Sequence, residues 1–265
     1  MFSGTRALYP RRRAHGHLTQ GTLCRVRWRI SLTPELTVSA VREGEPHKRL
    51  AYIGPTHSYD FDGLLTQLLA DGRLLATLSD DARSPVRFEC VGLFDESTPS
   101  FVLSRVLIGQ LVSLGAAVRL SVSRYAAARG HSGVPEIPET RVEFNLQSTT
   151  QSEPDEISQL LGLTPTATIR VGQIQPIVKL PSPRTAWQLK SKTLRAWNFD
   201  PLVHEVLTTL QARADVVASL TRHRFDGILS LVASFSDRSP EVNLTAGDLR
   251  LIRTLGLEVD VDLTA

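Results

Sequence analysis

The sequence predicts an α+β fold built from two tandem copies of a small module, each an antiparallel or mixed sheet with helices packed on one face. Two observations predict it. Residues 94–104 and 235–245 share a pattern at an offset of 141, which continues without a gap into the residues that follow. In both places apolar residues recur three apart and then alternate, which is typical of a short helix followed by a strand.

The positions that both copies share have structural explanations. Ser104 and Thr245 stand where a helix N-cap is expected, and Asp248 follows Thr245 by three residues as in a capping box. Gly115 and Gly256 stand where a left-handed residue would end each helix. The shared positions therefore describe a scaffold, and they identify no catalytic group.

The residues that precede this pattern in each copy resemble one another less clearly. Residues 61–65 resemble residues 199–203 at an offset of 138, and the alternating segment 25–30 resembles segment 141–146. In the second copy we expect the following elements: strand 142–146, helix 154–161, strand 187–189, helix 200–212, strand 228–235, helix 246–255 and strand 257–263.

Composition divides the chain into four segments. We expect residues 1–22 to be a basic disordered tail, 23–125 the diverged first copy, 126–140 a linker and 141–265 the second copy. Residues 1–30 hold seven Arg and no acid, so the rest of a chain with net charge +3 carries −4. The basic tail could hold nucleic acid; a solvated leader, or upstream sequence wrongly included in the reading frame, is the simpler interpretation.

The second copy contains a recognisable combination of motifs over about residues 141–263: Leu160–Thr166, Gly172, Trp187, the 199–210 segment and the closing 244–262 segment. In these motifs it resembles a bacterial family known as domain of unknown function 4279. The first copy departs from this pattern. The resemblance implies no activity; it associates the chain with small intracellular bacterial proteins of the immunity or accessory kind.

One candidate binding segment is basic. Residues 176–199 contain no acid and hold two tryptophans, Trp187 and Trp197, together with five cations: Lys179, Arg184, Lys190, Lys192 and Arg195. Cations interleaved with aromatic rings can bind phosphates and stack bases. A strand over 187–189 would instead direct Trp187 and Leu189 into the core, and Trp197 would seat the start of the next helix.

A second candidate is acidic. Glu258, Asp260 and Asp262 alternate with apolar residues, so they share one face of the last strand. Three carboxylates could hold a hard cation or serve an enzyme whose pocket converges on them. A charged face that prevents edge-to-edge pairing of sheets is the simpler interpretation.

No motif of a nucleotide-binding, hydrolytic or zinc site occurs, and no membrane-spanning stretch or secretory signal is visible. We therefore expect no catalytic residue, cofactor or metal, and a cytoplasmic location without membrane association. The first hypothesis is a non-enzymatic protein-binding module, leaving its oligomeric state open. Nucleic-acid binding through segment 176–199 and the tail is the second, and an enzyme that uses the C-terminal carboxylates is the third.

Overall fold

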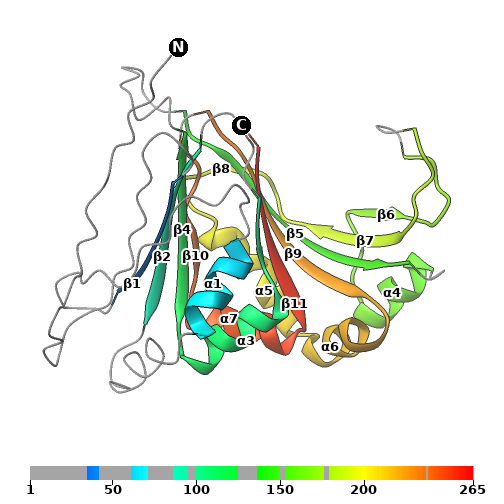
Figure 1. Cartoon of the computed structure of the whole chain (residues 1–265). Coiled ribbons are helices and arrows are strands. Elements are labelled where there is room, and N and C mark those ends of the chain that lie inside the picture. Colours follow the sequence, from blue (N-terminus) through cyan, green and yellow to red (C-terminus); the bar gives the residue numbers. More distant parts are fainter. Residues whose placement is uncertain are drawn as a thin grey trace, which may run out of the picture.

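The structure is a computed structural model, and it describes residues 35–41, 61–70, 86–94, 100–124, 136–149, 153–175, 179–236 and 238–264. The basic tail and segment 25–30 lie outside the described residues. Helices lie between two mixed sheets, so the molecule has three layers (Figure 1). The predicted α+β class with helices packed on mixed sheets is confirmed.

The first sheet has four strands in the order β1-β2-β4-β10. Its strands are β1 (Glu35–Val41), β2 (Arg87–Phe94), β4 (Ala117–Arg124) and β10 (Val242–Leu244). Strand β2 pairs antiparallel with β1 and parallel with β4, whereas β10 pairs antiparallel with β4.

The second sheet has seven strands in the order β3-β11-β9-β5-β7-β6, and β8 also pairs with β5. Its strands are β3 (Ser100–Leu103), β5 (Glu139–Ser148), β6 (Ala167–Ile169), β7 (Thr185–Lys190), β8 (Leu194–Arg195), β9 (Asp226–Ser234) and β11 (Leu257–Thr264). Strands β9 and β11 are parallel, and the other neighbours are antiparallel.

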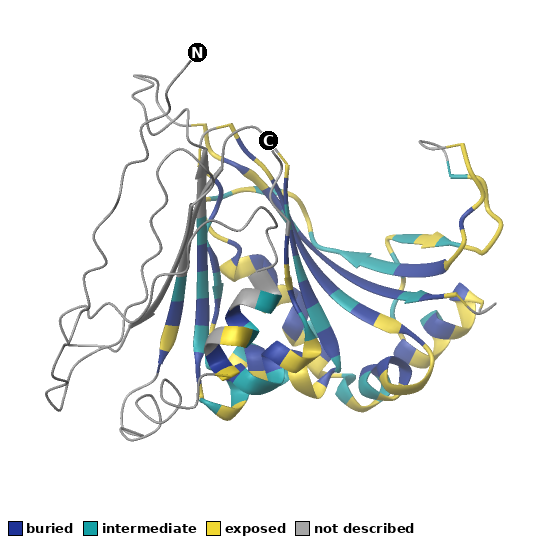
Figure 2. Ribbon diagram, viewed as in Figure 1, coloured by how far each residue is buried: buried dark blue, intermediate teal, exposed yellow. Residues whose placement is uncertain are grey.

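Both sheets bury their inner faces on helices. The described helices are α1 (Phe61–Ala70), α3 (Arg105–Ser113), α4 (Pro154–Leu161), α5 (Asp200–Gln211), α6 (Ala214–His223) and α7 (Ala246–Thr254). Helices α3 and α7 pack on each other, and α5 contacts both β5 and β10. One continuous core therefore joins the two sheets, as the buried residues of Figure 2 show.

The local signals of the sequence are found where they were expected. The side chain of Ser104 accepts a hydrogen bond from Leu107 N, and Thr245 forms a capping box with Asp248. Gly115, Gly162 and Gly256 all have φ between 61° and 68°. These conformations cost glycine nothing, and they end the preceding helices.

Two features of the fold differ from the expectation. We expected each copy to keep its own strands, but β3 joins the sheet of the later residues and β10 joins the sheet of the earlier ones. Each of these strands is separated by one capping residue from the helix that follows it, so the helix determines where the strand lies. Helix α6 was also missed; its buried face consists of Val217, Leu220 and Thr221.

Candidate binding surface

The seven-stranded sheet has two unlike faces. On its central strand β5, Val142, Phe144 and Leu146 are fully buried on the helix side. The residues between them point the other way, because side chains alternate along a strand. This other side, which no described helix covers, is called the open face (Figure 1).

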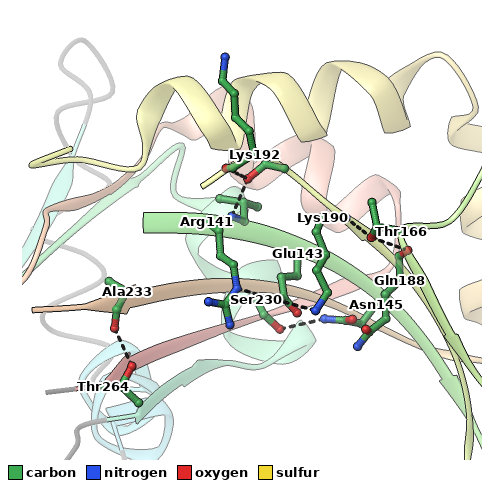
Figure 3. A network of polar contacts seen from close by, with 12 residues as sticks. Arg141, Glu143, Asn145, Thr166, Gln188, Lys190, Lys192, Ser230, Ala233 and Thr264 are labelled. Atoms are coloured by element: carbon green, nitrogen blue, oxygen red, sulfur yellow. Dashed lines mark hydrogen bonds and ion pairs between the residues drawn. The ribbon is translucent and has the colours of Figure 1, made fainter. Parts of the chain in front are cut away.

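Glu143 occupies the middle of the open face and is only 7% exposed. Its Oε1 accepts a hydrogen bond from Arg141 Nε at 2.7 Å and lies 3.4 Å from Lys190 Nζ. Figure 3 shows both cations converging on this carboxylate. An acid at such a buried position is tolerated because it is paired with the charges beside it.

Asn145 is the neighbour of Glu143 on the same face, and it is 4% exposed. Its Nδ2 donates a hydrogen bond to Ser230 Oγ at 3.2 Å, as Figure 3 shows. Its Oδ1 is buried and has no hydrogen-bond partner in the described structure. A buried acceptor without a donor costs about 1–3 kcal/mol, a cost that a donor from a bound partner would remove.

The predicted basic segment lies along β5. Arg184 Nη1 donates to Gln147 Oε1 at 3.3 Å, Lys190 meets Glu143, and Arg195 Nη2 lies 3.6 Å from Glu139 Oε1. Because β7 and β8 run antiparallel to β5, three of the five cations lie beside polar residues of β5. Lys192 is exposed after β7, and Lys179 is exposed with φ 55°.

The tryptophans do not alternate with these cations on a surface. Trp187 is fully buried, and its Nε1 donates to Ser158 Oγ at 3.0 Å. This confirms the interpretation that Trp187 packs in the core, where its ring meets Phe144 edge-on at 6.0 Å. Trp197 is 36% exposed, and Phe199 rather than Trp197 is buried at the start of α5. The expectation for Trp197 was therefore wrong.

The three acids of β11 lie on the open face, as predicted, because Val259 and Val261 are buried on the other side. They do not protect a sheet edge, since β11 lies between β9 and β3. That explanation was wrong: β3 comes from a distant part of the sequence. Within the described residues no cluster of three His, Cys, Asp or Glu could hold a metal ion.

A hollow of about 380 Å³ opens near the start of β5, lined by residues 136–139 and 234–236. The carboxylates of β11 do not line it.

Residues 170–175 and 179–184 form an arm that extends beyond β6 and β7 and rises at one end of the sheet (Figure 1). Backbone hydrogen bonds join Gly172 N to Ser182 O and Gln175 N to Leu180 O. Val171, Ile174 and Leu180 are 43%, 58% and 64% exposed. The arm therefore carries three of the exposed large apolar side chains of the described residues.

Sequence reasoning missed two polar groups that lie side by side on the open face, Arg141 with Glu143 and Asn145 with Ser230. A signal was present: polar residues alternate with apolar ones on β5, which is buried between two other strands. The partners from β7 and β9 are far away in the sequence, and only the sheet register brings them together.

Residues 138–265 match the family model of a domain of unknown function, DUF4279. The second half of the chain is a DUF4279 domain. The predicted resemblance is thereby confirmed, and the DUF4279 domain contains every strand of the seven-stranded sheet except β3. No curated protein and no solved structure matches the chain.

The open face belongs almost wholly to the DUF4279 domain, and so does the arm. Among the described residues, none of the helices is long and apolar enough to cross a membrane.

Proposed function

We propose that the protein is a non-enzymatic protein-binding module that holds its partner on the open face of the DUF4279 domain, beside the arm. The observation that carries the proposal is the acceptor of Asn145, buried beside the ion-paired Glu143 on a sheet face that no described helix covers. A partner that donates a hydrogen bond there would remove the cost of the unsatisfied oxygen.

The proposal has three further parts. The chain is a tandem duplication of one module, supported by the 141-residue offset. It works in the cytoplasm, and it is of the immunity or accessory kind.

Nucleic-acid binding receives less support from the geometry. Arg184, Lys190 and Arg195 are each matched by a residue of β5, and Trp187 cannot stack on a base because it is buried. The following experiment distinguishes nucleic-acid binding from protein binding.

The experiment uses a photo-crosslinking amino acid placed at single positions of the full chain in living cells. Val102 and Gln188 report on the open face, Leu180 on the arm, and the exposed Glu205 of α5 is the matched control. We expect one discrete protein adduct from the first three positions and none from Glu205. Adducts that disappear with nuclease would favour nucleic acid.

A second experiment repeats the Gln188 crosslink in a chain that carries Asn145→Leu and Ser230→Ala. The proposal requires the adduct to weaken at least tenfold while the purified chain keeps its melting temperature. An undiminished adduct, or the same adduct from Glu205, would contradict binding at the open face.

A further inference from the structure

Each sheet is completed by a strand from the other half of the chain. Strand β3 lies antiparallel to β11, with Val102 opposite Asp260 and Phe101 opposite Val261. Strand β10 lies antiparallel to β4, with Asn243 opposite Arg119. The exchange is reciprocal: the earlier half gives one strand and receives one.

The exchanged strands occupy equivalent places. Both sheets contain the same run of four strands, β1-β2-β4-β10 in one and β5-β9-β11-β3 in the other. Adding 141 to the residues of β3 and α3 gives those of β10 and α7 to within one residue at each end. Helices α3 and α7, which follow the exchanged strands, pack on each other. This is the arrangement of two subunits about a twofold axis, built within one chain.

The exchanged strands are held firmly. Phe101 and Leu103 are 2% and 3% exposed, and Val242 and Leu244 are equally buried. Ion pairs also cross between the halves, joining Arg119 to Glu241 and Arg105 to Glu258.

A single capping residue joins each exchanged strand to the helix that follows it. Leu103 is followed by the N-cap Ser104 and then by α3, and Leu244 is followed by the N-cap Thr245 and then by α7. The direction of each strand is therefore set by its own helix.

We infer that the β11 edge of the DUF4279 domain is a docking site for the β10 strand of a second DUF4279 domain. In the intact chain β3 of the first half occupies this edge. When the second half is released, two copies complete each other, with Asn243 of one copy opposite Asp260 of the other. The inference is independent of the proposed function, because the edge and the open face are different surfaces.

The test begins with the folded full chain, carrying a site-specific protease sequence between Gly130 and Gly133. After cleavage, both halves remain together as a one-to-one complex in native mass spectrometry. Halves that separate spontaneously and stay folded would overturn the inference.

The cleaved chain is then unfolded and refolded as a mixture, so that the halves can choose partners. The variant carries N243C and D260C, with Cys24→Ala and Cys90→Ala to remove the native thiols. Opposite residues in neighbouring antiparallel strands have Cα atoms about 4.5–5.5 Å apart, which lies within the Cα–Cα range that a disulfide spans. In the intact chain Asn243 faces Arg119 instead, so the N243C–D260C disulfide reports only a pair of second halves.

We expect a disulfide-linked dimer of second halves that is at least tenfold more abundant than in the control pair N243C and D215C, which uses an exposed position on α6. Refolding that yields only one-to-one complexes without this dimer overturns the inference. So does a second half that refolds as a monomer or fails to refold except with the first half.

Discussion

The four-stranded and seven-stranded sheets share a strand order, but their outer faces have opposite charges at the centre. In the four-stranded sheet, Arg119 lies opposite Glu89 and is paired with it at 3.9 Å and with Glu241. In the seven-stranded sheet, Glu143 is paired with Arg141 and Lys190. One arrangement of strands thus supports a cation between acids and an acid between cations.

The inner faces do not differ in this way. Val118 and Leu120 on β4 match Val259 and Val261 on β11, and all four are buried. The comparison shows that the inner pattern is required by packing, whereas the outer pattern is free to vary. Specific binding should therefore be sought on the outer faces, and there the arm and the unsatisfied acceptor belong to the DUF4279 domain.

The largest effect should come from the exchanged strands, because each is needed by the opposite sheet. Leu103→Ala and Leu244→Ala remove fully packed side chains, and each should lower the free energy of unfolding by about 2–5 kcal/mol. Denaturant unfolding followed by the fluorescence of the buried Trp187, in a chain whose Trp28 and Trp197 are replaced by Phe, measures this loss. Val106→Ala, at a position 67% exposed, is the control.

The first prediction also says that a substitution in one half lowers the stability measured in the other half. Leu103 lies in the first half, whereas Trp187 reports on the second. A Leu103→Ala chain whose Trp187 transition is unchanged would show that the halves unfold separately.

A smaller difference should separate two glycines that occupy equivalent positions. Gly115 and Gly256 both have positive φ, so alanine at either position should cost about 1–2 kcal/mol. A Cβ at Gly115 would meet no atom within 4 Å, whereas one at Gly256 would lie 2.6 Å from Thr221 Oγ1. That hydroxyl donates to Leu255 O at 2.8 Å.

We therefore expect Gly256→Ala to cost more than Gly115→Ala in chemical denaturation. A Thr221→Ala substitution in the Gly256→Ala background should recover part of the difference. Equal losses at the two glycines would mean that the two helix ends are packed alike.

A third prediction concerns the acceptor on the open face. Asn145→Leu combined with Ser230→Ala replaces both members of a buried hydrogen bond by apolar groups, a change that is close to neutral or stabilising by up to about 1 kcal/mol. The same double variant should lose its partner. A melting temperature lowered by many degrees would instead mean that the pair supports the fold.

Sequence reasoning recovered what depends on neighbours along the chain. The two N-caps, the left-handed glycines and the bounds of helix 154–161 follow from residues within one or two turns of each other. The exchange of β3 and β10 could not be predicted, because alternation tells which face of a strand is buried but not which strand lies beside it. The polar groups at Glu143 and Asn145 were missed for the same reason: their members come from three strands.

The smallest effect should come from an ion pair between α4 and α6, helices without a counterpart among the described residues of the first half. Arg224 Nη1 donates to Glu156 Oε1 at 2.9 Å and Nη2 to Oε2 at 3.3 Å. These hydrogen bonds, and then the positive charge of Arg224, hold the pKa of Glu156 below its ordinary value. Because both groups are at the surface, screening by solvent keeps the effect on stability small.

The sign of the pH dependence follows from the direction of that shift. The pair stabilises the fold above the ordinary pKa of a glutamate, and the contribution is lost as the pH falls through the lowered pKa of Glu156. A carboxyl NMR titration should show the pKa of Glu156 rising when Arg224 is replaced by Gln. The wild type and Glu156→Gln should differ slightly in melting temperature at neutral pH and converge in acid. A difference that grows in acid would mean that Glu156 is held in its protonated form, and that α4 and α6 are joined by something other than this ion pair.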